Sequence, residues 1–188
     1  MTRSTSAIFE ALRQKLGPQV ESVRADREDE IYVLLRDADI RPITEYLRGE
    51  FGARLVTMFA EDRRSVEGVF FNYYVFEQKG SAQYLIVQAP VPSDTLEFPS
   101  LSVELPAVNW QEREIHDWFG LKAVGHPNPR RVALHDNWPD VYPLRKDFSL
   151  ETVLPPFEGE RHIYRPAFGE GVLQVPVGPV HEIGRAHV

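Results

Sequence analysis

The chain has 188 residues, a net charge of −7 at pH 7 and no cysteine. An acidic chain without a long run of Lys or Arg lacks the charge pattern of a nucleic-acid-binding protein. Because cysteine is absent, disulfides, iron–sulfur ligation and thiol catalysis are excluded for this chain, and any redox centre must belong to a partner.

The length suits about one domain plus an extension, which is large enough to bury a core. No apolar run approaches the roughly 18 residues that a membrane-spanning helix needs, and residues 1–16 show no signal-peptide pattern. We therefore expect the chain neither to span a membrane nor to be exported by a visible signal, and to reside in the cytoplasm.

Hydrophobic periodicity predicts helices and strands throughout the first 90 residues. In chain order, we expect a helix over residues 8–16, a strand over 31–35, a helix from Asp39 to Phe51 and a strand over 54–60. Residues 68–77 are so rich in Phe, Tyr and Val that they predict a strand covered on both faces, joined by a hairpin to a strand over 81–87. This order predicts an α+β fold with a mixed, largely antiparallel sheet and flanking helices.

A further helix is expected over residues 109–119. Asn109 is a suitable N-cap, Glu112 stands three residues later as in a capping box, and Gly120 suits a left-handed C-cap. The helix carries three carboxylates beside Arg113 and His116, and we interpret them as an ion-pair network rather than a general acid/base group. The carboxylates are Glu112, Glu114 and Asp117.

After residue 121 the periodicity disappears, while Pro and Gly become frequent. We expect residues 1–121 to form the α+β domain and residues 122–181 to form an extended, irregular C-terminal arm that lies along a partner and depends on it for order. The arm carries Arg130, Arg131, Arg145 and Lys146, which could bind phosphate or a lipid headgroup, although acidic residues of a partner fit Arg better.

Two chemical alternatives receive little support from the sequence. Glu112 and His116 could offer two metal ligands on one helical face, but the further candidates His126 and His135 lie in a loop of unknown geometry. No Ser lies in a Gly-x-Ser-x-Gly elbow, so a hydrolase is not indicated. We expect no metal, no cofactor and no catalytic residue in this chain.

The region from residue 112 to residue 148 resembles the signature of the 30 kDa subunit of respiratory complex I, the NADH–quinone oxidoreductase. The residues that carry the resemblance, here called the signature residues, are Glu112, Arg113, Glu114, Asp117, Phe119, Gly120, His126, Arg130, Arg131, Pro143, Leu144, Arg145, Lys146, Asp147 and Phe148. Residues 174–181, which end in Gly-Pro-Val-His, look like the junction at which a domain of this 30 kDa type is fused to a large subunit. Such fusions occur in complex I and in membrane-bound nickel–iron hydrogenases of the formate hydrogenlyase type.

We therefore expect the chain to be the amino-terminal domain of a longer polypeptide. Residues 182–188 resemble the translation of a common sequencing adapter, so we expect them to be a non-native tail.

The resemblance implies a non-catalytic docking domain of a membrane-associated oxidoreductase, peripheral on the cytoplasmic side of the inner membrane. Its partners would be a large (D-like) subunit, an iron–sulfur small (B-like) subunit and the membrane arm of the complex. Iron–sulfur clusters, and nickel–iron in a hydrogenase, would lie in those partners or downstream, and the whole assembly would couple electron transfer to ion translocation. The alternative is a free-standing adaptor that recruits another partner through the same Arg/Glu/aromatic surface.

Overall fold

The computed structural model of the chain describes residues 5–155, apart from positions 28, 79, 81 and 136. The expectations for residues 156–188, which include the fusion junction and the tail, lie outside the described residues. In chain order, the elements are α1 (Thr5–Leu16), a 3-10 turn (Gly17–Gln19), β1 (Val20–Arg27), β2 (Glu30–Leu35), α2 (Arg41–Gly49), β3 (Ala53–Asp62), α3 (Arg64–Glu67), β4 (Val69–Gln78), β5 (Tyr84–Pro92), β6 (Glu97–Pro99), a 3-10 turn (Pro106–Val108), α4 (Asn109–Phe119) and β7 (Lys122–Val124).

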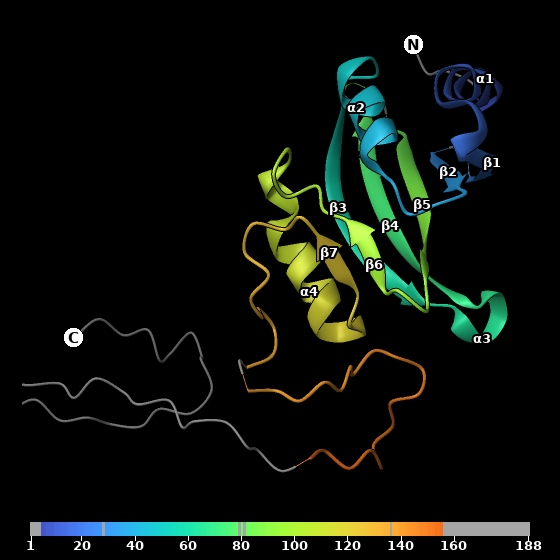
Figure 1. The fold of residues 1–188 in the computed structure, drawn as a ribbon. Coiled ribbons are helices and arrows are strands. Elements are labelled where there is room, and N and C mark those ends of the chain that lie inside the picture. Colours follow the sequence, from blue (N-terminus) through green and yellow to red (C-terminus); the bar gives the residue numbers. More distant parts are fainter. Residues whose placement is uncertain (1–4, 28, 79, 81, 136, 156–188) are drawn as a thin grey trace, which may run out of the picture. The chain divides into compact units, whose positions relative to one another are not determined.

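The main sheet has five strands in the order β1-β2-β5-β4-β3 (Figure 1). Neighbouring strands are antiparallel except β2 and β5, which pair in parallel with Tyr32 opposite Ile86. A second, two-stranded parallel sheet joins β6 to β7. The predicted α+β fold with a mixed, largely antiparallel sheet is confirmed, and so is the hairpin between β4 and β5.

One face of the main sheet packs against α1, α2 and α4 and forms the core. Each helix contributes apolar side chains from one face, as its sequence pattern predicts. The helical core residues include Ile8, Leu12, Ile43, Leu47, Ile115 and Phe119, and they pack on strand residues that include Val33, Met58, Phe70, Tyr74 and Val87. α4 lies on the β3 side of the sheet, next to β6 and β7 (Figure 1).

The other face of the sheet carries a smaller cluster of Phe71, Tyr73 and Ile86. The ring of Phe59 stacks on Tyr73 at 4.9 Å between centroids and 6° between ring planes. β4 is therefore buried on both faces, but the second face is shielded by side chains of the strands themselves, because no helix of the described residues contributes to this cluster. The expected burial of this strand on both faces is confirmed.

The helix after Asp39 is shorter than expected and runs from Arg41 to Gly49. Asp39 Oδ1 accepts the backbone N–H of Arg41 at 3.2 Å, which satisfies one of the free donors of the first turn. Pro42 lies in this first turn, where a missing N–H costs nothing. In the part of the chain that the structure describes, no helix has the length and apolar character needed to cross a membrane.

The structure describes the C-terminal arm from the end of β7 to residue 155, and from here on the arm means this part. Its described residues, from 125 to 155, contain no helix or strand. Figure 1 shows the arm leaving β7 and passing beside α4. Its course is set by hydrogen bonds to α4 and to the end of β3, which belong to the candidate site.

Candidate functional site

α4 begins at Asn109 directly after a 3-10 turn, and the capping position is Val108, which has no side-chain cap. The predicted capping box between Asn109 and Glu112 was therefore wrong. The predicted end of the helix is confirmed, because Gly120 is left-handed with φ 72° and its N–H donates to the carbonyl of His116 at 2.8 Å.

Glu112 is a buried carboxylate, with only 1% of the residue exposed. Its Oε1 accepts the backbone N–H of Leu101 at 2.7 Å, and its Oε2 accepts the hydroxyl of Ser100 at 2.6 Å and the hydroxyl of Ser102. These three donors replace the water that burial removes. Glu112 thus ties α4 to the segment that follows β6.

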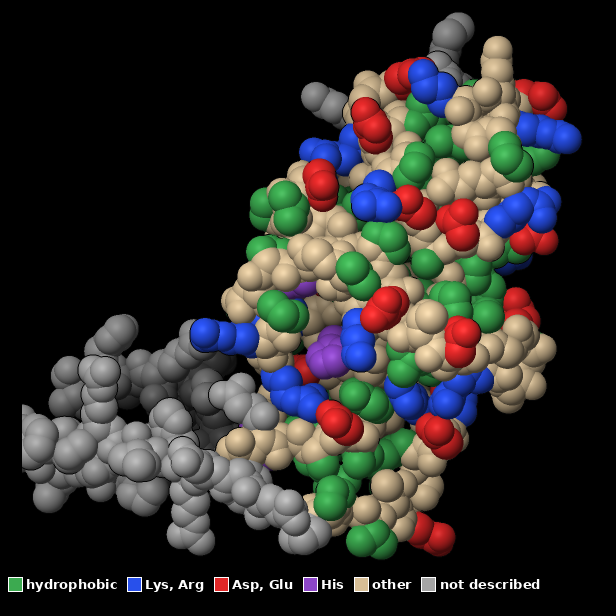
Figure 2. All heavy atoms as spheres, in the orientation of Figure 1, with side chains coloured by type: hydrophobic (Ala, Val, Ile, Leu, Met, Phe, Trp, Pro, Cys, Tyr) green, Lys and Arg blue, Asp and Glu red, His purple; other side chains and the backbone are tan. Residues whose placement is uncertain are grey.

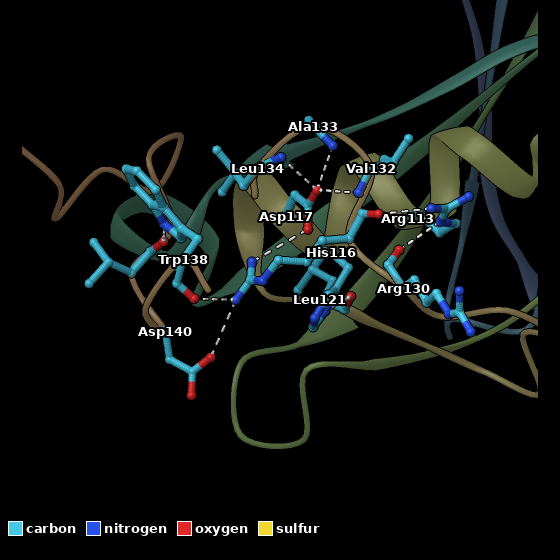
Figure 3. Close-up of polar contacts among 12 residues, drawn as sticks. Arg113, His116, Asp117, Leu121, Arg130, Val132, Ala133, Leu134, Trp138 and Asp140 are labelled. Atoms are coloured by element: carbon cyan, nitrogen blue, oxygen red, sulfur yellow. Dashed lines mark hydrogen bonds and ion pairs between the residues drawn. The ribbon is translucent and has the colours of Figure 1, made fainter. Parts of the chain in front are cut away.

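Asp117, one turn further along α4, is fully buried and binds the arm (Figure 3). Its Oδ2 accepts three consecutive backbone N–H groups, those of Val132 at 2.9 Å, Ala133 at 2.7 Å and Leu134 at 3.1 Å. Its Oδ1 accepts Nη1 of Arg131 at 3.4 Å. Charge-assisted bonds of this kind are stronger than neutral ones, so a single carboxylate fixes a run of four arm residues.

Arg113 holds the same part of the arm from another position on the helix (Figure 3). Its Nε donates to the carbonyl of Arg130 at 2.6 Å and its Nη2 donates to the carbonyl of Arg131 at 2.8 Å. The planar guanidinium presents these donors as a fork, which suits two successive carbonyls. Asp117 and Arg113 therefore grip the arm through its N–H and C=O groups respectively.

The predicted ion-pair network within the helix was wrong in its partners. Arg113 binds carbonyls rather than carboxylates, Glu112 binds hydroxyls and an N–H group, and exposed Glu114 accepts the indole N–H of Trp118 at 3.3 Å. Only Asp117 meets an arginine, and that arginine comes from the arm. Apart from Trp118, the bonding partners lie outside the helix, where sequence spacing cannot indicate them.

Arg131 continues the network along the arm. Its side chain is only 13% exposed, and Nη2 donates to the carbonyl of Trp138 at 3.1 Å and lies 3.6 Å from Asp140 Oδ1. The indole N–H of Trp138 donates in turn to the carbonyl of Val141 at 2.8 Å. The donors of Arg131 are thus used inside the chain, on groups of Asp117, Trp138 and Asp140, which Figure 3 labels.

A second attachment lies where the arm passes the end of α4. Arg145 Nε donates to the carbonyl of Phe119 at 2.7 Å, and the guanidinium stacks on the ring of Tyr142 at 4.3 Å. A methyl group on Gly120 would lie 2.6 Å from Arg145 Nη2 and from Tyr142 Cζ, so only glycine fits there. Burial and the nearby Arg64 lower the pKa of Arg145 below its usual value.

The third attachment is made by Asp62 at the end of β3. Asp62 Oδ2 accepts the backbone N–H of Lys146 at 2.9 Å, and both of its oxygens accept Arg64, at 2.9 Å from Nε and 2.7 Å from Nη2. The hydrogen bond from Arg64 is the largest cause that holds the pKa of Asp62 down at about 2. Arg64 also contacts Asp147 at 3.1 Å, so the arm is bound here through both backbone and side chain.

The two histidines near Glu112 both have partners. The side chain of His126 is 1% exposed; its Nδ1 accepts the N–H of Asn128 at 2.9 Å, and its Nε2 lies 3.1 Å from the carbonyl oxygen of Asn109 and 3.8 Å from Glu112 Oε2. His116 Nδ1 lies 3.2 Å from the carbonyl of Leu121. In the described parts of the chain, no three His, Asp or Glu side chains are arranged to hold a metal ion.

A pocket of about 270 Å³ opens between α4, β7 and the start of the arm. We call it the α4 pocket, and it is lined by Glu112, Arg113, His116, Lys122, Ala123, His126 and Pro129. It brings together signature residues that lie up to 14 positions apart in the numbering, from Glu112 to His126.

Residues 33–153 match the family described as "Respiratory-chain NADH dehydrogenase, 30 Kd subunit". The chain belongs to this family. The matched residues reach from β2 to β7 and include α4 and the arm up to its last contacts with the domain. In this chain, the residues called signature residues above are mainly side chains and backbone groups that hold α4 and the arm together.

Similar proteins of known sequence include components of hydrogenase-4, of formate hydrogenlyase and of NADH-quinone oxidoreductase. The chain is 32% identical to hydrogenase-4 component G of Escherichia coli strain K12 over 180 residues, covering 93% of this chain and 32% of that protein. It is 33% identical to formate hydrogenlyase subunit 5 of the same strain over 159 residues, covering 82% and 28%. It is 31% identical to the C subunit of the NADH-quinone oxidoreductase of Geobacter metallireducens over 156 residues, covering 80% of this chain and 93% of that protein. The chain therefore spans about a third of the two hydrogenase proteins and nearly all of the third relative.

Solved structures show that the fold is that of the 30 kDa subunit family. A chain of the membrane-bound sulfane sulfur reductase, an archaeal respiratory membrane complex, matches with a TM-score of 0.61 and 23% identity over 78% of this chain and 86% of that chain. The trypsin-resistant fragment of Nqo5 matches with a TM-score of 0.53 and 16% identity over 64% and 98%.

The structure separates the signature residues of this family member into two groups. The buried or half-buried group includes Glu112, Arg113, Asp117, Phe119, Gly120, His126, Arg131, Pro143, Arg145 and Phe148. The exposed group comprises Glu114, Arg130, Leu144, Lys146 and Asp147. Sequence reasoning missed Ser100, Ser102, Asp62 and Arg64, because each meets a signature residue only through the fold and has no local motif.

Proposed function

We propose that the chain is a non-catalytic docking domain of a membrane-associated oxidoreductase complex, of the NADH–quinone or the membrane-bound nickel–iron hydrogenase kind. The observation that carries this proposal is the bonding of Asp117. A buried carboxylate could serve in proton transfer, but here it accepts four donors from its own arm and has no access to a substrate. This bonding supports a structural role for Asp117 rather than a chemical one.

The proposed activity is that of the whole assembly, which transfers electrons and couples this to ion translocation. Without cysteine, this chain has no thiolate ligands for an iron–sulfur cluster, so the clusters, and nickel–iron where present, are assigned to partner subunits or to other parts of a longer polypeptide. The chain supplies a scaffold on which those parts are held.

The proposed partners are a large (D-like) subunit, an iron–sulfur small (B-like) subunit and, through them, the membrane arm, with the chain peripheral on the cytoplasmic side. The exposed signature residues are suited to such contacts. Leu144 is 53% exposed near exposed Lys146, and exposed Arg130 lies where Arg113 fixes the arm backbone. Arginine and apolar side chains on a rigid support are typical of protein interfaces.

The sequence suggests that three arginines of the arm bind acidic residues of a partner, and in the structure these arginines differ in exposure and bonding. Arg130 has an exposed side chain, whereas Arg131 and Arg145 are bonded within the chain. Charge reversal at all three would therefore damage the arm as well as an interface. Arg130→Glu alone is the sharper variant.

The test is co-purification from the organism that encodes the chain. A tagged copy of the 188-residue chain, expressed there as a separate polypeptide, should be recovered from detergent-solubilised membranes together with an iron–sulfur small subunit and a large subunit, identified by mass spectrometry. Arg130→Glu should reduce this recovery, whereas Arg48→Glu, at an exposed position on α2, should not. Recovery only with proteins outside such complexes would instead favour a free-standing adaptor.

A further inference from the structure

We infer that the α4 pocket is a socket for one carboxylate side chain of the partner large subunit, a glutamate or aspartate held between Lys122 and Arg113. This inference rests on the proposed function, because the occupant is assigned to a subunit of the complex. The size, lining and charge of the pocket indicate the chemistry of one contact at that interface.

The volume of the pocket sets the size of the occupant. At about 270 Å³ it lies just below the range of about 300–1,000 Å³ that is typical of sites for drug-sized ligands and cofactors. One inserted side chain is the scale of an interface anchor, in which a projecting residue fills a pocket of its partner.

The charges around the pocket select an anion. Arg113 and Lys122 both line it, and within the part of the chain that the structure describes neither forms an ion pair with a carboxylate. Arg113 uses Nε and Nη2 on arm carbonyls, which leaves Nη1 as a donor. Glu112 also lines the pocket, but Ser100, Leu101 and Ser102 already occupy its oxygens. The lining thus holds two basic side chains and one carboxylate, and the oxygens of that carboxylate are already hydrogen-bonded.

The walls select an occupant with an apolar stem. Ala123 and Pro129 line the pocket, and the methylene stems of Lys122 and Arg113 add apolar surface below their charged ends. In Figure 2 a histidine side chain is visible on the face shown, with Lys, Arg, Asp and Glu side chains around it. The hydrocarbon stem of a Glu or Asp side chain suits the apolar walls, and its carboxylate suits the charged ends of Lys122 and Arg113. Inorganic phosphate suits only the charged ends.

The first experiment titrates the isotope-labelled full chain with 4-methylpentanoate and with its neutral analogue 4-methylpentanamide, followed by NMR. The acid should bind with a dissociation constant on the order of millimolar, as expected for so small a ligand, and should shift the amide signals of Lys122, Ala123 and His126. The amide and inorganic phosphate should each bind at least about fivefold more weakly, which corresponds to one charge contact near the surface.

Lys122→Glu is the variant that tests the socket, because the side chain is exposed and its backbone N–H bond to Leu96 is independent of the side chain. It should weaken binding of the acid at least about fivefold, while Arg48→Glu leaves it unchanged. An unchanged melting midpoint, within about 2 °C, shows that the fold is retained.

The second experiment repeats the co-purification with Lys122→Glu and Arg48→Glu. Reduced recovery of the large subunit with Lys122→Glu alone is the expected result. Full recovery with Lys122→Glu overturns the socket even if the acid probe binds, and equal binding of acid, amide and phosphate overturns it as well. If the wild-type chain recovers no large subunit, the proposed function fails first, so the two failures are distinguishable.

Discussion

Asp117 Oδ2 accepts the backbone N–H of Ala133 at 2.7 Å, although the two residues lie 16 positions apart. The bond is one of three that this oxygen accepts from consecutive arm residues. A segment without helix or strand thus takes a defined path because its backbone N–H groups bond to a side chain rather than to another strand. Much of this path depends on one carboxylate.

Replacing Asp117 by asparagine should loosen the arm and destabilise the domain. The amide keeps the shape but loses the charge, so the guanidinium of Arg131 and the three N–H groups lose a charged acceptor. We expect a loss of about 3 kcal/mol in the free energy of unfolding, as for a broken buried ion pair. Urea denaturation measures this loss, and hydrogen exchange at residues 132–134 should accelerate.

The control for this variant is Glu114→Gln on the exposed side of the same helix, which should change stability by less than about 0.5 kcal/mol. Equal stability losses in the two variants would show that Asp117 does not anchor the arm.

Gly120→Ala should lower the free energy of unfolding by more than the strain of a left-handed alanine alone would. Gly52 has a similar φ of 60° with nothing near its Cβ position, whereas a Cβ on Gly120 would overlap Arg145 and Tyr142. Gly52→Ala should therefore lose about 1 kcal/mol, and Gly120→Ala about 2 kcal/mol more because the arm must move. Urea denaturation of both variants checks the difference, and the amide of Lys146 should exchange faster only in Gly120→Ala.

Asp62 should make stability depend on pH in the acid range. Its pKa is lowered from 3.8 to about 2, chiefly by the hydrogen bond from Arg64. A carboxyl whose folded pKa lies below its unfolded value stabilises the fold above the unfolded value, and this contribution is lost as the pH falls through the folded value. Asp62→Asn should thus be about 2 kcal/mol less stable than wild type at pH 6, with the difference disappearing between about pH 4 and pH 2.

The measurement is urea denaturation from about pH 2 to about pH 6, which spans the titration of the carboxyl in both states. Asp140→Asn is a suitable comparison, because the side chain of Asp140 is 91% exposed. A wild-type minus Asp62→Asn difference that stays constant with pH would contradict the assignment.

Arg113→Ala should destabilise the domain moderately, because it removes two donors from arm carbonyls without leaving a buried carboxylate unpaired. A loss of about 2 kcal/mol corresponds to a fall of about 4–8 °C in the melting midpoint for a chain of this size. Arg113→Lys should restore little, since an ammonium group cannot reproduce the fork. Full recovery in the lysine variant would indicate that only charge matters at this position.

Much of the sheet is predictable from the sequence because its central strands are made of Phe, Tyr and Val. β4 and β5 each hide most of their side chains, so composition alone marks them. β1 escapes prediction because it is an edge strand with most of its residues exposed, and its pattern of burial hardly alternates. β6 and β7 have three residues each, too few for any period to show.

The site is predictable in its residues and not in its bonds. The signature places Glu112, Arg113 and Asp117 on one helix, and spacing then favours partners within that helix. Their actual partners are the backbone of residues 130–134 and the side chains of Ser100 and Ser102. Such bonds depend on how β6, β7 and the arm return to the helix, which no local pattern encodes.

The order of the strands bears on how the chain can assemble during synthesis. The pair β1–β2 and the meander β3–β4–β5 each form between neighbours in the sequence, but the parallel ladder of β2 with β5 joins them across α2, β3 and β4. While the ribosome is still making that middle part, the inner edge of β2 has no neighbour to pair with. The residues up to α2 therefore leave the ribosome as an open-edged unit, whose protection from misassociation depends on how soon β5 follows.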